Sequence, residues 1–158
     1  MSIWGIGGKL VLYTALFSAV IVPINSHFLP QWCFTWMPEN VALVLGSVFV
    51  LIGGVILAMS IIPVTGAFRK GKLASTGIYS VVRNPLYSAW IVFILPGMAI
   101  MSRYFLWWLI PVFTYIVFKM LIKKEDTYLE ERLGEEYRAY RSKVNELIPR
   151  IWPHRKNK

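Results

Sequence analysis

A helix start preceded by a basic loop is the first place where this chain could do chemistry. Asn84 stands directly before Pro85. That order is typical of a helix N-terminus, because Asn is a favoured cap and Pro at the first helical position gives up no needed hydrogen bond. The backbone amides of Leu86 and Tyr87 then remain free at a positive helix end, where an anion can bind, and Arg83 adds a positive charge beside them. A capped membrane helix with an arginine anchored at the lipid headgroups agrees with these residues at least equally well.

A carboxylate forms the second candidate. Glu125 and Asp126 are the first acids after the last apolar block of the chain, and we expect Glu125 to face a cytoplasmic pocket. The aromatic rings of Tyr79 and Tyr87 offer flat amphipathic surfaces near the helix start. Together, an anion site, aromatic surfaces and a carboxylate would suit a zwitterionic, aromatic and cationic cofactor such as S-adenosylmethionine. The remaining acids of this segment are expected to form a solvated face: Glu130, Glu131, Glu135 and Glu136.

The elements that position these residues are expected to be membrane helices. The chain has 158 residues, of which 56% are hydrophobic and only 16% are charged, whereas soluble proteins are nearer ~25% charged. A spanning helix needs about 20 apolar residues. The apolar blocks predict spans over residues 10–29, 41–62, 85–102 and 104–122, although Pro96-Gly97 and Pro111 interrupt the last two. We therefore predict an all-α, multi-pass membrane protein with about four transmembrane helices in a single domain, 1–158.

Charge distribution predicts the orientation of this bundle. The segment 66–84 carries four basic residues and no acid, and the segment after Lys119 is dense in charge. The positive-inside rule then puts this segment and both termini in the cytoplasm, and the small size suggests a bacterial inner membrane. An aromatic belt is expected at the opposite interface, formed by Trp32, Trp36, Tyr104, Trp107 and Trp108. The net charge of +9 fits this topology and anionic membrane lipids, so nucleic acid is not expected as a partner.

Residues 123–146 predict an amphipathic cytoplasmic helix. Its apolar residues recur at steps of three and four: Leu129, Leu133, Tyr137, Tyr140 and Val144, followed by Leu147 and Ile148. Gly134 is a weak point or a turn within it. The apolar face could lie on the membrane or cover the loop before Pro85. Cys33, His27 and His154 are isolated from one another in sequence, so no metal site is expected.

Both chemical segments resemble a family of integral membrane enzymes. Residues 77–87 are similar to the Gly-x-Tyr-x-x-x-Arg-His-Pro-x-Tyr signature of the isoprenylcysteine carboxyl methyltransferases, with Asn84 in place of His. The related phospholipid N-methyltransferases have Asn-Pro-Met-Tyr there. Residues 125–140, followed by Ile148-Pro149, resemble the C-terminal motif of the same enzymes. The basic residue that usually lies four positions before the cofactor Glu is Leu121 here, which leaves the substrate open.

The resemblance implies a methyltransferase that uses S-adenosylmethionine and a lipophilic acceptor, either the carboxylate of a prenylcysteine-like compound or the amine of a phospholipid. Catalytic roles are implied for Arg83 and Glu125. The implied cofactor site comprises Gly71, Lys72, Leu73, Ala74, Tyr79, Asn84, Pro85, Leu86, Tyr87 and Glu125. The expected partners are this acceptor and membrane lipids.

Two other functions are compatible with the sequence. A membrane NADPH-dependent sterol or enone reductase has a similar C-terminal architecture, but those enzymes resemble Pro-Asn-Tyr-x-Gly-Glu at the helix start, and residues 85–90 lack that Asn and Glu. A non-catalytic four-helix membrane scaffold would bind no cofactor. Cofactor binding by the purified protein separates these functions.

Overall fold

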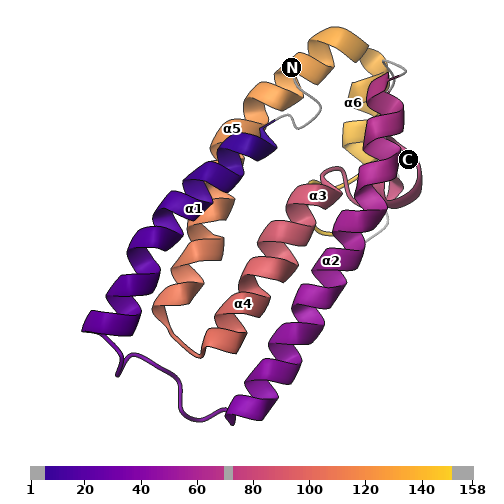
Figure 1. The fold of residues 1–158 in the computed structure, drawn as a ribbon. Coiled ribbons are helices and arrows are strands. Elements are labelled where there is room, and N and C mark those ends of the chain that lie inside the picture. Colours follow the sequence, from indigo (N-terminus) through magenta and orange to yellow (C-terminus); the bar gives the residue numbers. More distant parts are fainter. Residues whose placement is uncertain (1–5, 70–72, 151–158) are drawn as a thin grey trace, which may run out of the picture.

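The computed structural model describes residues 6–69 and 73–150, and in this part of the chain all regular structure is helical. Its α-helices are α1 (Gly7–Pro23), α2 (Glu39–Arg69), α3 (Pro85–Ser88), α4 (Leu95–Ser102), α5 (Leu109–Leu133) and α6 (Glu135–Lys143). Two π-helical stretches, Ile24–Phe28 and Ala89–Ile94, and two 3-10 turns, Gly77–Ser80 and Leu106–Trp108, complete it. α1 lies along α5, and α2 lies along α3 and α4 (Figure 1).

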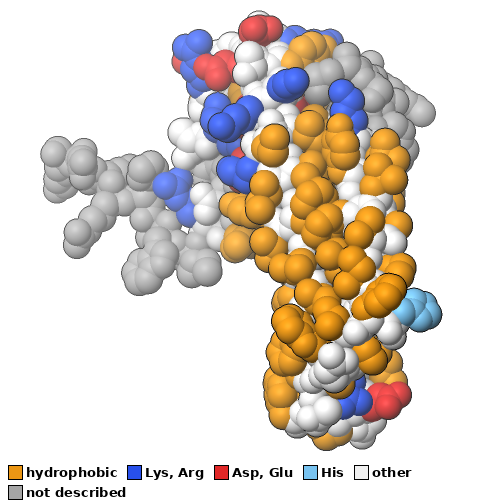
Figure 2. Space-filling model, turned by 90° about the vertical axis from the view of Figure 1, so that its left-hand side faces the viewer, with side chains coloured by type: hydrophobic (Ala, Val, Ile, Leu, Met, Phe, Trp, Pro, Cys, Tyr) orange, Lys and Arg blue, Asp and Glu red, His pale blue; other side chains and the backbone are white. Residues whose placement is uncertain are grey.

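Four of these helical stretches are long and apolar enough to cross a membrane: Gly7–Phe28, Glu39–Ala67, Pro85–Ser102 and Leu106–Leu133. The predicted all-α fold with four spans is therefore confirmed. Figure 2 shows the matching surface, a long belt of hydrophobic side chains with most charges gathered at one end. The third span stays continuous through Pro96 because the π-helical stretch Ala89–Ile94 precedes it, and wider helical turns absorb the missing proline donor.

The predicted helix 123–146 is divided in the structure. Its first half is a continuation of α5, which runs as far as Leu133. The apolar block ends near residue 122, but the charged residues that follow have good helix propensity and prolong the helix. Gly134 ends it at a φ of 54°, which glycine adopts easily, and its amide donates to the Glu130 carbonyl at 2.9 Å. α6 begins directly afterwards, so the change of direction at Gly134 folds the end of the chain back onto the bundle.

Small residues bring α2 and α4 together. A Cβ atom on Gly46 would lie 2.6 Å from the carbonyl oxygen of Gly97, and one on Gly97 would lie 2.8 Å from the carbonyl oxygen of Gly46. Glycines of this kind let membrane helices approach closely, where packing rather than the hydrophobic effect holds them. α1 and α5 are joined differently, through a buried hydrogen bond of 3.0 Å between the hydroxyls of Thr14 and Thr114.

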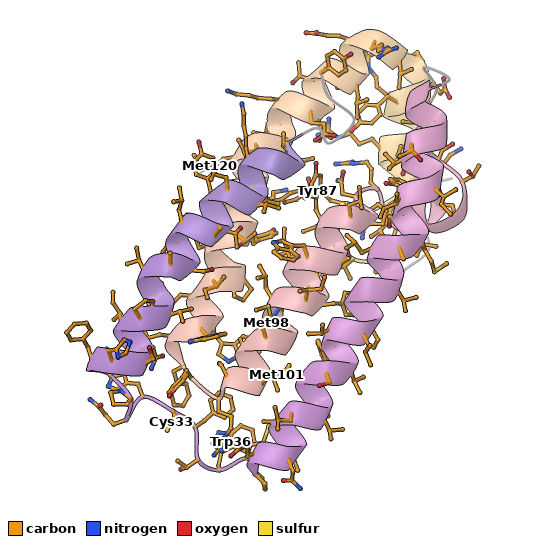
Figure 3. All side chains as sticks on the ribbon, in the orientation of Figure 1. Cys33, Trp36, Tyr87, Met98, Met101 and Met120 are labelled. Atoms are coloured by element: carbon orange, nitrogen blue, oxygen red, sulfur yellow. The ribbon has the colours of Figure 1, made fainter. Side chains whose placement is uncertain are left out.

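The end of the bundle remote from most charges is closed by two paired loops. The amide of Phe34 donates to the Arg103 carbonyl at 2.9 Å, and the amide of Phe105 donates to the Trp32 carbonyl at 3.1 Å. This pairing brings the segments 32–36 and 104–108 to one end, as the predicted aromatic belt requires. Trp36 lies at this end in Figure 3, well away from Tyr87.

Candidate functional site

The helix start before the third span has the predicted order but not the predicted cap. Pro85 occupies the first helical position, and the first backbone hydrogen bond runs from the Ser88 amide to the Asn84 carbonyl at 2.9 Å. No described residue accepts a hydrogen bond from the amides of Leu86 or Tyr87. The prediction that the Asn84 side chain caps this helix is wrong, since it makes no capping hydrogen bond. Its Nδ2 is instead buried without any partner in the described chain.

Glu125 is held against this helix start by two donors. Its Oε2 accepts the Tyr87 hydroxyl at 3.3 Å and the backbone amide of Ile6 at 3.4 Å. Its Oε1 accepts no hydrogen bond from the described residues. The structure therefore brings together Tyr87 and Glu125, which are 38 residues apart, and leaves one carboxylate oxygen available. The pairing of a carboxylate with the helix start agrees with the sequence interpretation.

Arg83 takes part in a buried ion network, so its side chain is not the exposed anchor at the lipid headgroups that one interpretation of the sequence expected. Its Nη2 lies 3.2 Å from Oδ2 of Asp126 and 3.5 Å from Oε1 of Glu146, and the side chains of Arg83 and Asp126 are each 9% exposed. Lys119 pairs with the other oxygen of Glu146 at 2.6 Å, and Tyr137 donates to Asp126. These ion pairs give Arg83 a structural role; the catalytic role that the resemblance implies for it remains a prediction.

The segment Asn145–Leu147 is joined to the helix start by three hydrogen bonds. The amides of Arg83 and Asn84 donate to the carbonyls of Asn145 and Glu146, at 2.7 and 3.0 Å, and the Ser88 hydroxyl donates to the Leu147 carbonyl at 2.6 Å. The Leu147 side chain enters a core cluster that includes Leu10 of α1 and Phe118 of α5. Residues 145–147 thus fix the backbone at the helix start that carries the free amides.

Tyr79 is buried and links the loop before the helix start to α2 and α6. Its hydroxyl donates to the Ser60 carbonyl in α2 at 3.4 Å, and its own carbonyl accepts the hydroxyl of Tyr140 at 2.6 Å. Burial raises the pKa of Tyr79 well above its usual value, and the nearby charge of Glu125 adds to the shift. Burial also raises the pKa of Tyr140 to about 12 and, with the hydrogen bond to Asp126, that of Tyr137. All three tyrosines therefore stay protonated donors at neutral pH.

The other predicted cofactor residues are placed only in part. Leu73 and Ala74 are half-buried in the irregular segment before the turn Gly77–Ser80, whereas Gly71 and Lys72 lie outside the described residues. α6 covers this region through Tyr140, so of the two placements open to the amphipathic segment, the structure shows the one over the loop. Nowhere in residues 6–69 and 73–150 do three His, Cys, Asp or Glu residues gather as a metal site would require.

Asp126, Glu146 and Lys119 were not selected from the sequence, although one signal pointed to Asp126. Apart from Pro111, the buried residues of α5 recur every four positions: Ile110, Thr114, Phe118, Ile122 and Asp126. That spacing puts Asp126 on the inner helix face. Glu146 gave no such signal, because its partners Arg83 and Lys119 lie 63 and 27 residues away and only the fold brings them together.

Comparison with known proteins identifies the family. Residues 41–136, more than half of the chain, match the family described as phospholipid methyltransferase. The match runs from α2 into the first turn of α6, and so includes the helix start, Tyr79, Arg83, Glu125 and Asp126. Neither the curated proteins nor the solved structures contain a match to this chain. From the family match, the chain belongs to the phospholipid methyltransferase family.

Proposed function

We propose that this protein is a membrane methyltransferase that uses S-adenosylmethionine and methylates the amine of a phospholipid headgroup. One observation carries the proposal: Glu125, whose Oε1 has no described partner, accepts the hydroxyl of Tyr87, a residue of the helix start where the amides of Leu86 and Tyr87 are unpaired, and all three lie inside the region that matches the family. A carboxylate joined through Tyr87 to a helix start with free amides complements a ligand that carries both a positive and a negative group.

The residues present fit the proposed cofactor. The amides of Leu86 and Tyr87 would bind its carboxylate at the positive helix end. The Nδ2 of Asn84 is a buried donor without a partner, and such a donor is costly unless a ligand satisfies it. The free oxygen of Glu125 would accept from the cofactor's ammonium or hydroxyl groups, and Tyr79 would hold the loop before the helix start through its hydrogen bonds with Ser60 and Tyr140. When bound, the cofactor supplies a methyl group on a sulfonium centre, ready for displacement by a nucleophile.

The chain contributes positioning and the exclusion of water rather than an evident general base. Tyr87 and Ile6 hold the Glu125 carboxylate, and the segment Asn145–Leu147 is hydrogen-bonded to the helix start. Such preorganisation lowers the entropic part of the barrier for a displacement reaction. A lipid acceptor would approach from the bilayer, and the cofactor from the charged end of the bundle, which we propose faces the cytoplasm of a bacterial cell.

The family match supports an amine over a prenylcysteine carboxylate as the acceptor, and this choice can be tested by pH. An alkyl amine with a pKa near that of lysine, about 10.4, is mostly protonated at neutral pH. Its methylation should therefore accelerate about tenfold per pH unit below that pKa, while a carboxylate with a pKa of about 4 should show a flat profile. The measurement is kcat/KM between neutral and mildly alkaline pH with each acceptor.

The two alternatives make different predictions for the same protein. A reductase would bind NADPH, and a scaffold would bind neither cofactor. Calorimetric titration of the purified protein with S-adenosylmethionine and with NADPH decides among them, followed by transfer of a radiolabelled methyl group to phosphatidylethanolamine. Binding of the first cofactor with label in the lipid is the expected result. Binding of NADPH alone, or of neither, would refute the methyltransferase proposal.

A further inference from the structure

A cavity of about 300 Å³ lies at the end of the bundle opposite the proposed methyltransferase site. Its lining includes Cys33 and Tyr104 from the paired loops, Glu39 and Leu43 from the start of α2, and Arg103. Figure 3 shows Cys33 and Met101 at this end, with Tyr87 far along the bundle. The volume is at the lower limit of small-molecule sites, which suits a headgroup rather than a whole lipid.

One positive and one negative side chain face each other loosely in this cavity. Nη1 of Arg103 lies 3.8 Å from Oε2 of Glu39, and their side chains are 25% and 76% exposed. The Nε of Arg103 is buried with no partner in the described chain. A contact of 3.8 Å is a loose ion pair and too long for a hydrogen bond, so each charged group can still bind a further partner.

The backbone at Arg103 supports a role for its side chain. Arg103 has a φ of 60°, the left-handed conformation, and it is the sole non-glycine residue with a positive φ among those described. It ends α4 in the position where glycine is usual, because a side chain there is strained. Its carbonyl accepts the Phe34 amide, so the paired loops fix the backbone from which the Arg103 side chain extends. Strain of this kind at a cavity is a reason to look for function.

We propose that this cavity binds the headgroup of a zwitterionic phospholipid that carries an ammonium group. Arg103 would bind the phosphate and Glu39 the ammonium, so the paired charges of the site match the paired charges of the ligand. The occupant is a membrane lipid because the cavity adjoins the hydrophobic belt: Leu43 lines it and is 43% exposed, and Trp36, at the same end of the bundle in Figure 3, is 75% exposed. Such aromatic residues settle at the headgroup level of a bilayer. This site is independent of methyl transfer and lies at the other membrane face.

Cys33 provides a direct test, since it is the only cysteine in the chain and lines this cavity. The rate of its modification by N-ethylmaleimide therefore reports occupancy of this site and not of the methyltransferase site. In detergent, dihexanoylphosphatidylethanolamine should slow modification about tenfold at ten times its Kd, because only the unoccupied protein reacts. Dihexanoylphosphatidylglycerol should slow it much less, and glycerophosphoethanolamine, which lacks acyl chains, should bind more weakly than the lipid.

Two variants test the assigned charges. Arg103→Gln should raise the Kd for dihexanoylphosphatidylethanolamine about tenfold or more, as expected when a charge-assisted hydrogen bond is lost. Glu39→Gln should remove the preference for this lipid over dihexanoylphosphatidylglycerol, whereas Glu131→Gln, exposed at the opposite end, should change neither.

The wild-type protein alone can overturn the proposal, even if a variant fails to fold. Equal protection of Cys33 by both lipids would mean a site for anions, and no protection by either would mean no lipid site. Protection by glycerophosphoethanolamine as strong as that by the lipid would identify a soluble ligand instead. Protection that survives unchanged in both Arg103→Gln and Glu39→Gln would also refute it.

Discussion

Replacing Glu125 by Gln separates cofactor binding from folding. Both hydrogen bonds to its Oε2 come from neutral donors and are long, 3.3 Å from Tyr87 and 3.4 Å from Ile6. The amide oxygen of Gln can still accept from them, and removal of a partly buried charge relieves its desolvation cost. The variant should therefore melt at or slightly above the wild-type temperature. Its affinity for S-adenosylmethionine should fall, because a charge-assisted hydrogen bond is worth about 1.5–3 kcal/mol, or about ten- to a hundredfold in Kd.

The assay pairs a melting curve without ligand with a calorimetric titration of S-adenosylmethionine. Glu131→Gln is the matched control, since it removes the same charge from an exposed position of the same helix, and its Kd should equal that of wild type. Tyr87→Phe removes one neutral donor to Glu125 and should weaken binding by less than Glu125→Gln does. Equal losses at Glu125 and Glu131, or an unchanged Kd for Glu125→Gln, would show that Glu125 is not a cofactor ligand.

Three further predictions concern stability, the helix start and orientation. Gly46→Ala should lower stability by about 1–3 kcal/mol because its Cβ would meet the carbonyl of the facing helix, whereas Gly54→Ala, with no atom within 4 Å, should be neutral or stabilising; thermal denaturation compares them. Asn84→Ala should keep or slightly raise the melting temperature, since its side chain makes no cap and its buried Nδ2 has no described partner, yet it should weaken S-adenosylmethionine binding; a lower melting temperature with normal affinity would contradict this. Cys33 should react with an impermeant maleimide added to intact cells, whereas Lys124→Cys in a Cys33→Ser background should react only after permeabilisation. Labelling of both positions from the same side of the membrane would refute the orientation.

The spans could be predicted because membrane crossing depends on local composition. Each apolar block had to be helical, since only a helix satisfies its own backbone groups within lipid. The helix that carries the fourth span runs past the predicted span end at residue 122, because hydropathy detects where the apolar residues stop and not where the helix stops. The helix continues through Lys124 and Glu125 to Gly134, where backbone conformation ends it. Glu125 therefore lies on a rigid extension of a membrane helix.

The site was predictable to the extent that its residues lie in short motifs. The order Asn84-Pro85 gave the helix start and its free amides, but an Asn in that position does not reveal whether its side chain or its backbone is used. In the fold, the Asn84 amide is taken by the Glu146 carbonyl and its Nδ2 has no described partner. Contacts across 63 or 119 residues, such as those of Arg83 with Glu146 and of Glu125 with Ile6, depend on packing that no local pattern encodes.

Two of the residues that hold the proposed site lie outside the region that matches the family. The match covers residues 41–136, yet Ile6 precedes that region and Glu146 follows it. Ile6 donates to the carboxylate of Glu125, while Glu146 binds both Arg83 and the amide of Asn84. Residues on both sides of the matched region therefore contact the proposed cofactor site. The family motifs supply the free amides and the carboxylate, and the flanking segments decide how firmly these groups are held.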